Sequence, residues 1–176
     1  ALAAGSIKNA TDEPDSTIAS AAQGALSFTV TPGSPDPQVL ILHTHATETY
    51  QTWDTPVYDP DFTARTKDTT LNMCAVGEAT TKVLNDAGIT TLHDTTLHDS
   101  PSYTESYARS AQTARRYLEE YPSIKVVLDV HRDAMESGDA RVRPLTTLDG
   151  QPTAQVMIIA GCNNGGTVQL PNWRLN

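Results

Sequence analysis

The sequence has few cysteines and no long apolar run. Its 176 residues include two cysteines, Cys74 and Cys162, which do not form a Cys-x-x-Cys pair. One disulfide and two buried thiols are both compatible with them, so they do not indicate the redox compartment. No apolar run approaches the roughly 18 residues of a membrane span. Residues 1–28 also lack the basic start and apolar centre of a signal peptide, so we expect any targeting segment outside this sequence.

Basic residues are scarce as well. The sequence has 12 Lys and Arg against 21 Asp and Glu, which gives a net charge of -9, and the basic residues do not cluster. This charge argues against nucleic acid or an anionic membrane surface as the main partner, because both attract cationic proteins. A neutral or cationic ligand is more compatible with this net charge than an anionic one. The length suits one domain, and an apolar fraction of 38% is enough for one core.

The apolar pattern predicts an α/β fold with a mostly parallel sheet, flanking helices and a β-hairpin. Short apolar runs alternate with segments of helical periodicity, which is typical of a parallel sheet with right-handed crossovers. The expected strands are 26–30 at an edge, 38–43, 89–92 and 124–130, and the expected helices are 69–87 and 102–120. The hairpin should have arms 141–148 and 153–160 around the turn Asp149-Gly150, with the second arm the more buried.

The first 24 residues differ in composition from the rest. They are weakly hydrophobic, with scattered Ala and Ser, so we interpret residues 1–24 as a linker or a loosely packed arm that contains a short helix near 18–22. Residues 25–176 would then form the folded domain.

Histidines follow two of the expected strands directly. The segment His43-Thr-His45-Ala-Thr-Glu48 comes after the apolar run 38–42, and His131-Arg132-Asp133 comes after the strand 124–130. The carboxyl ends of parallel strands meet at one edge of a sheet, so imidazoles from distant positions can converge there. Zinc sites need such convergence of histidines. The sequence therefore predicts a metal-dependent hydrolase.

Four segments in chain order carry a more specific resemblance. They are His43-Thr-His-Ala-Thr-Glu-Thr-Tyr50, Asn72-Met-Cys-Ala-Val-Gly-Glu78, His131-Arg-Asp133, and 161–173 with its Asn172-Trp173 pair. No single segment is long, but together they resemble the stage II sporulation protein P family over about residues 38–176. That family consists of cell-wall hydrolases related in fold to the zinc N-acetylmuramoyl-L-alanine amidases.

The resemblance implies a zinc site. Alignment with the amidase zinc strand puts His45 at the first metal position, and His43 becomes a supporting or substrate-facing residue. His131 is a second ligand, because it ends an apolar strand where an unpartnered imidazole would be costly to bury. The third ligand has two candidates. Asp68 stands where the amidases carry a ligand glutamate, although it could instead cap a helix. Glu48 follows His45 by three residues and could bind the same ion or act as the base.

Other residues have less specific interpretations. Arg132 could orient a carboxylate of the peptide stem or stabilise the oxyanion, and a surface pair with Asp133 is an equally economical account. The Leu-His-Asp contexts of His93 and His98 are more typical of exposed or Asp-paired histidines than of metal ligands.

The implied activity is zinc-dependent hydrolysis of the amide between N-acetylmuramic acid and the L-alanine of the stem peptide, with cleavage of stem crosslinks as a second activity. It would serve septal peptidoglycan degradation and engulfment during sporulation, beside a lytic transglycosylase partner. We expect an extracytoplasmic protein in the intermembrane space of the forespore septum, anchored by a segment upstream of residue 1. The alternative is a non-catalytic module that binds or activates the transglycosylase.

The resemblance also implies that residues 25–176 are a C-terminally incomplete amidase-like domain. The family's domain continues beyond Asn176 with a helix, a strand and a glutamate that the amidase relationship suggests is catalytic.

Overall fold

The computed structural model describes residues 6–51, 56–57, 59–163, 170 and 172–175. The chain divides into two compact units, one formed by 28–142 and the other by 1–27 together with 143–176. Within the described ranges, no helix combines the length and the apolar character that a membrane span needs. The expected division into 1–24 and 25–176 stays a prediction.

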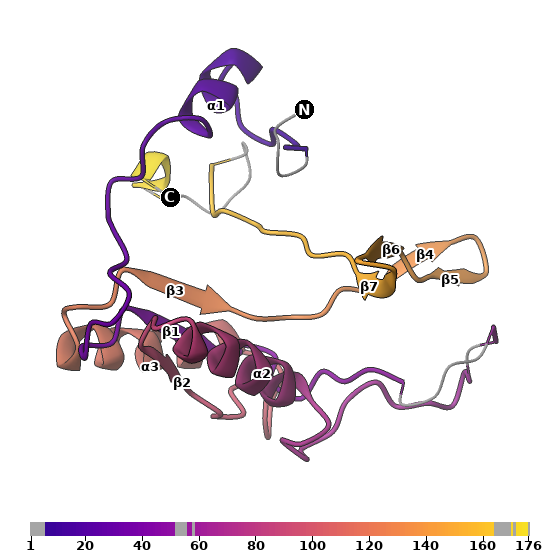
Figure 1. The fold of residues 1–176 in the computed structure, drawn as a ribbon. Helices are drawn as coiled ribbons and strands as arrows, with labels where there is room; N and C mark the ends of the chain where they lie inside the picture. The colour runs from indigo at the N-terminus through magenta and orange to yellow at the C-terminus, as the bar shows by residue number, and fades with distance from the viewer. Residues whose placement is uncertain (1–5, 52–55, 58, 164–169, 171, 176) are drawn as a thin grey trace. The chain divides into compact units, whose positions relative to one another are not determined.

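Three parallel strands form the sheet of the unit 28–142 (Figure 1). They are β1 Val39–Leu42, β2 Thr91–His93 and β3 Val126–Asp129, in the order β2-β1-β3. All four residues of the central strand β1 are buried. This burial explains its unbroken apolar run, because a strand covered on both faces has no solvent-facing side. The predicted parallel α/β architecture is confirmed.

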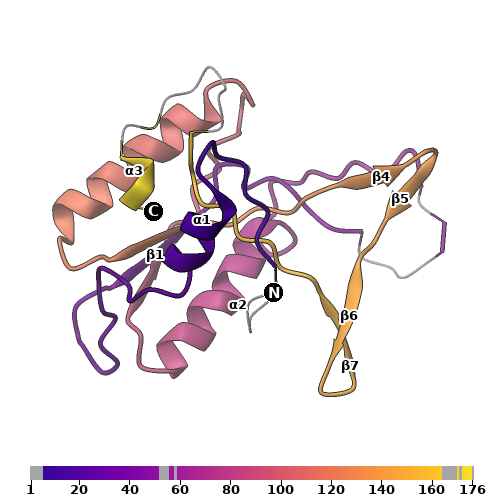
Figure 2. The same ribbon diagram turned by 90° about the horizontal axis from the view of Figure 1, so that it is seen from above.

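Two helices cover opposite faces of this sheet (Figure 2). They are α2 Met73–Asp86, between β1 and β2, and α3 Ser106–Glu120, between β2 and β3. Since β2 and β3 flank β1 on opposite sides, right-handed crossovers place the two helices on opposite faces. Asn72 caps α2 by accepting a hydrogen bond from the backbone N–H of Cys74. Both helices begin later than expected, at 73 instead of 69 and at 106 instead of 102.

The buried core lies between the sheet and α3. Leu40, Leu42 and Ile124 form its central cluster, and Ala114 and Tyr117 of α3 pack against that cluster. These contacts fix the end of β1, from which the chain continues to the histidine segment.

The helix α2 approaches the other face of the sheet closely at Gly77. A Cβ atom at this position would lie 2.5 Å from Nε2 of His43 and 2.4 Å from Nε2 of His93. Real Cβ atoms essentially never come so close to another atom, so the two imidazoles occupy space that glycine alone leaves open.

The predicted edge strand 26–30 is wrong, because the structure has no strand there. Leu26 is 75% exposed. The backbone of Thr31 is bonded to the side-chain amide of Gln38 rather than to a neighbouring strand, through both its N–H and its carbonyl. A loop held by one side chain therefore replaces the expected strand.

Two hairpins follow β3, and each lies within one unit. They are β4 Met135–Ser137 with β5 Ala140–Val142, and β6 Leu145–Leu148 with β7 Gln151–Ala154. The first was not expected. The second turns at Asp149-Gly150 as predicted, but its second arm ends at Ala154, and the run from Val156 to Ile159 is exposed instead of buried. The predicted burial of this arm is wrong.

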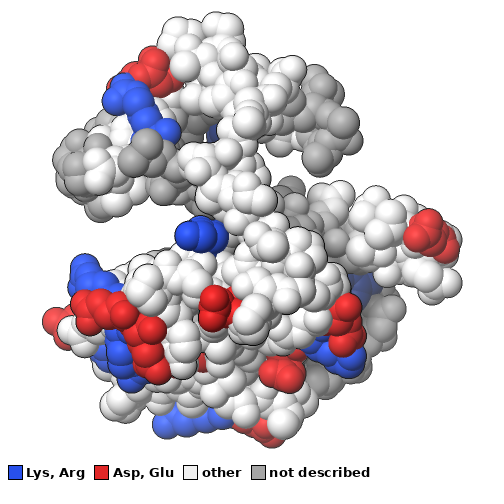
Figure 3. Space-filling model, turned by 60° about the vertical axis from the view of Figure 1, so that its left-hand side comes forward, with Lys and Arg blue, Asp and Glu red and all other residues white. Residues whose placement is uncertain are grey.

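Among its described residues, the unit formed by 1–27 and 143–176 has little regular structure besides β6 and β7. It contains α1 Asp15–Ala21, near the predicted short helix, and a 3-10 turn at Trp173–Leu175. Arg174 forms an ion pair with Glu13. On the face of the molecule in Figure 3, acidic and basic side chains lie intermixed.

Candidate metal centre

The strand order brings two distant histidine segments together. β1 and β3 are parallel neighbours, with Leu42 paired to Asp129, and the N–H of Val130 donates to the carbonyl of Leu42 at 2.9 Å. The strand order reverses between β1 and β3, and open α/β sheets form ligand sites at such a point. The segments that begin at His43 and at Val130 therefore leave the sheet side by side.

His45, Glu48 and His131 form a group that could hold a metal ion, because their ligand atoms all lie within 4.8 Å of one another. Nδ1 of His45 is 3.8 Å from Oε1 of Glu48, and Nδ1 of His131 is 3.8 Å from Oε2. His45 and Glu48 are buried, and His131 is partly exposed. The Glu48 carboxylate thus lies between two imidazole nitrogens at a site with access to solvent.

The far nitrogens of both histidines have protein partners. Nε2 of His131 lies 3.0 Å from Oδ2 of Asp129, and Nε2 of His45 lies 3.2 Å from Oγ of Ser106. A carboxylate only accepts, so Nε2 of His131 carries the hydrogen and its Nδ1 faces Glu48. A metal-binding histidine commonly donates its second nitrogen in this way, which fixes the ring. Asp129 also accepts from the N–H and the hydroxyl of Thr44, and so ties the ends of β1 and β3 together.

The pKa values of the three residues reflect burial and the nearby carboxylates of Glu48 and Asp129. Hydrogen bonding to Asp129 and to Glu48 raises the pKa of His131 to about 9. Burial raises the pKa of Glu48, but the nearby His131 and the backbone N–H of Arg132 outweigh burial and leave the pKa below its usual value. Burial lowers the pKa of His45. Two carboxylates around one imidazole therefore favour a positive charge at this place, either a proton or a metal ion.

Two arginines contact Glu48 in different ways. The backbone N–H of Arg132 donates to Oε2 of Glu48 at 3.3 Å, while its guanidinium donates to the carbonyls of Thr49 and Ala64. The Arg132 side chain thus holds the loop after Glu48. The guanidinium of Arg65 lies 3.5 Å from Oε1 of Glu48, and it also donates to Asp99.

Asp68 lies outside the group. It is fully exposed, and its carboxylate accepts hydrogen bonds from the N–H and the hydroxyl of Thr70. These two bonds lower its pKa. Of the two candidates for the third ligand, the structure places Glu48, and not Asp68, with His45 and His131.

The remaining histidines contact one another and the backbone of the segments that carry the group. Nδ1 of His43 donates to the carbonyl of Val130, and its Nε2 lies 2.9 Å from Nε2 of His93. His93 also faces Glu78 at 3.3 Å. His98 is buried, and its Nδ1 donates to the carbonyl of His43 at 2.8 Å. His43 and His98 therefore hold the backbone of the two segments that carry the candidate ligands.

Two tyrosines flank the imidazoles. The ring of Tyr103 stacks on His45 with centroids 4.5 Å apart, and the ring of Tyr107 meets the same imidazole edge-on at 5.2 Å. Both tyrosines are more than half exposed. They give the site an aromatic border that belongs to α3 and the turn before it.

Comparison with known proteins identifies the family of the chain. A family model for stage II sporulation protein P (SpoIIP) matches residues 4–176. The chain belongs to this family. It is 27% identical over 129 residues to the stage II sporulation protein P of Bacillus subtilis (strain 168), an alignment that covers 70% of the chain. The chain spans about 30% of the length of that relative. No solved structure matches the chain at a significant level.

Membership of the SpoIIP family confirms the resemblance and links the chain to sporulation. The sequence interpretation of this SpoIIP-family chain did not include Asp129 or Ser106. Asp129 had a usable signal, since it is the last residue of the strand β3 and precedes His131 by only two residues. Ser106 had none, because its role depends on where α3 begins.

The contact between Asp129 and His131 predicts a measurable titration. In the chelator-treated SpoIIP-family chain, His131 should titrate with a pKa of about 9, followed by NMR of its ring protons. Asp129→Asn should move this pKa down toward about 6.5, because it removes one of the two carboxylates that stabilise the imidazolium. Asp133→Asn, which neutralises an exposed carboxylate nearby, is the control and should leave the pKa unchanged. A pKa that stays near 9 in Asp129→Asn would show that Asp129 has no such role.

Proposed function

We propose that this chain is a zinc-dependent peptidoglycan hydrolase that cleaves the amide between N-acetylmuramic acid and the L-alanine of the stem peptide, and also stem crosslinks. The observation that carries the proposal is the group of His45, Glu48 and His131 at the carboxyl edge of β1 and β3. Family membership supports a role in sporulation and a cell-wall substrate.

The donor atoms of the group fit zinc. Two imidazole nitrogens and a carboxylate oxygen form a ligand set of catalytic zinc sites, which keep a fourth position for water or substrate. His131 and His45 are held at Nε2 by Asp129 and Ser106, so their Nδ1 atoms remain available on the side of Glu48. We therefore assign all three residues of the group to zinc, with Glu48 as the third ligand.

Zinc at this position would supply a Lewis acid for the scissile carbonyl and lower the pKa of a water molecule to about 7. The protein residues around it have separate tasks. Asp129 fixes the His131 ring, and the Arg132 side chain holds the loop that contains Glu48. The side chain of Arg65 is 39% exposed beside Glu48, where it can attract a carbonyl oxygen or a carboxylate of the stem peptide.

The exposed tyrosines suit the glycan part of this substrate. Tyr103 and Tyr107 present aromatic surface next to His45, and such surfaces bind the apolar faces of sugar rings. The proposal includes an extracytoplasmic location in the forespore septum, a membrane anchor upstream of residue 1, and action beside a sporulation lytic transglycosylase.

Purified sacculi test the proposed reaction. Zinc-loaded protein should release stem peptides with a new L-alanine amino terminus, detected by mass spectrometry. Treatment with a chelator should reduce release to background, and added zinc should restore it. Release that continues after chelation would contradict the zinc requirement. The absence of any product with a free L-alanine amino terminus would contradict the amidase assignment.

A further inference from the structure

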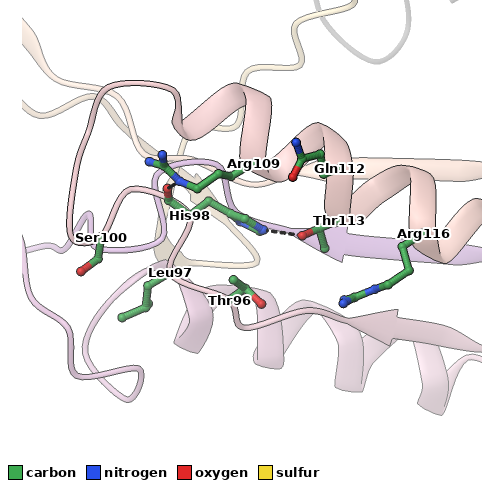
Figure 4. Close-up of a pocket in the computed structure, with 8 residues that line it drawn as sticks. All are labelled: Thr96, Leu97, His98, Ser100, Arg109, Gln112, Thr113 and Arg116. Carbon is green, nitrogen blue, oxygen red and sulfur yellow. Dashed lines mark hydrogen bonds between the residues drawn. The ribbon is translucent and has the colours of Figure 1, made fainter.

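A second polar site lies between α3 and the loop that follows β2. It is a pocket of about 370 Å³ (Figure 4). One wall is the face of α3 that carries Arg109, Gln112 and Arg116, and the other wall is the loop 96–100. None of the lining residues belongs to the metal group. Its volume falls within the range of small-molecule sites, which is roughly 300–1,000 Å³.

Arg109 is held in place in this pocket. Its Nε donates to the carbonyl of His98 at 2.6 Å, and its terminal nitrogen donates to the carbonyl of Ser102. The His98 ring is itself fixed, because its Nε2 lies 2.9 Å from the hydroxyl of Thr113 (Figure 4). One guanidinium of the pocket is therefore anchored by the backbone before any ligand binds.

Arg116 lies two turns further along the same face of α3, with a side chain that is 65% exposed. Its guanidinium stacks over the ring of Tyr117 at 5.3 Å. It lies 3.7 Å from Oδ2 of Asp94, which is longer than a hydrogen bond. The Asp94 carboxylate already accepts from the N–H of Thr96 at 3.0 Å. Arg116 is thus oriented at the pocket without a short ion pair to occupy it.

The charge of the pocket differs from that of the whole chain. The pocket lining contains two guanidinium groups and no carboxylate, and the Asp94 carboxylate lies 3.7 Å from one of these groups. The chain as a whole has a net charge of -9, and acidic and basic side chains lie intermixed on the face shown in Figure 3. Guanidinium groups bind carboxylates and phosphates with paired N–H donors. We propose that this pocket binds an oxyanion, a carboxylate or a phosphate, carried by a polar molecule. Hydroxyl groups of Thr96 and Ser100 and the amide of Gln112 provide further donors along its walls.

NMR titration of the 176-residue chain tests this site. The protein is labelled with nitrogen-15 and treated with a chelator, so that no anion binds through a metal ion. The probes are inorganic phosphate and, separately, the dipeptide N-acetyl-L-alanyl-D-glutamate. Saturable shifts should appear in residues 96–100 and 109–116. Saturation by phosphate alone or by the dipeptide alone would support the site and identify which source of oxyanion it accepts.

A matched pair of variants separates the pocket from general charge. Arg116→Gln should weaken binding by about tenfold, because it removes a charged donor. Arg115→Gln removes the same charge at the adjacent exposed residue of α3, outside the pocket lining, and should leave affinity unchanged. Equal weakening by both variants would overturn the proposal, as would the absence of saturable shifts with both probes. Neither result would affect zinc binding by His45 and His131.

Discussion

Replacing either His45 or His131 by alanine should lower the affinity for zinc by more than about 100-fold, because loss of residues that merely orient a ligand already costs about 10- to 100-fold. Each substitution removes one of the three donors of the group. Release of stem peptides from sacculi should fall to background in both variants. Competition with a chromophoric chelator measures the affinity, and circular dichroism checks the fold.

His93→Gln is the matched control for these two variants. It removes an imidazole that contacts His43 and Glu78 but does not belong to the metal group. We expect it to retain stoichiometric zinc. Full zinc binding by both His45→Ala and His131→Ala would refute the assignment of the metal site. Loss of zinc in all three variants would indicate a general effect of removing histidine.

Glu48→Gln and Asp68→Asn should differ in their effect on zinc. Glu48→Gln replaces the carboxylate that lies 3.8 Å from Nδ1 of both histidines, so zinc affinity should fall by about 100-fold or more. Asp68→Asn changes an exposed side chain bonded to Thr70, so affinity should not change. Both substitutions remove one negative charge, which makes the second a control for the first. Isothermal titration with zinc measures both.

The turnover of Glu48→Gln adds a second measurement. If this variant retained zinc but hydrolysed sacculi about 100-fold more slowly, Glu48 would be the base instead of a ligand. If neither substitution changed affinity or turnover, the third ligand would lie at another position. If Asp68→Asn alone lost zinc, the assignment based on the amidase resemblance would be correct, and the group formed around Glu48 would not be the metal site.

The sequence predicted the elements whose signal is local and strong. The run Val39–Leu42 is wholly apolar, and the regions of α2 and α3 show clear helical periodicity, so the sheet and its crossovers were accessible. The segment 26–30 has the same alternation as a strand, but the structure forms no strand there. The late start of α2 depends on the cap at Asn72, which pattern alone did not distinguish from Asp68.

Part of the candidate site could also be predicted, because the histidines that follow the strands are a local signal in the sequence. Two parallel strands that end in histidine imply convergence at one edge, whatever the details of the loops. The choice between Glu48 and Asp68 depends on the turn after His45, where the N–H of Glu48 donates to the carbonyl of His45 and directs the carboxylate back toward the ring. The partners of the histidine Nε2 atoms come from other elements, and their contacts arise only in the folded chain.

The two imidazoles that α2 approaches at Gly77 also belong to a chain of hydrogen bonds with a defined direction. Nδ1 of His43 must donate to the carbonyl of Val130, and burial lowers the pKa of His43, which favours the neutral ring, whose Nε2 can only accept. His93 must then be the donor of the contact between the two rings. The two hydrogen bonds therefore run in the same direction. His93 of β2 donates to His43, and His43 donates to the carbonyl of Val130, the residue before His131. A larger side chain at position 77 would displace the rings of both His43 and His93. Because His43 is bonded to the residue before His131, this displacement would disturb the metal site without any direct contact with its ligands.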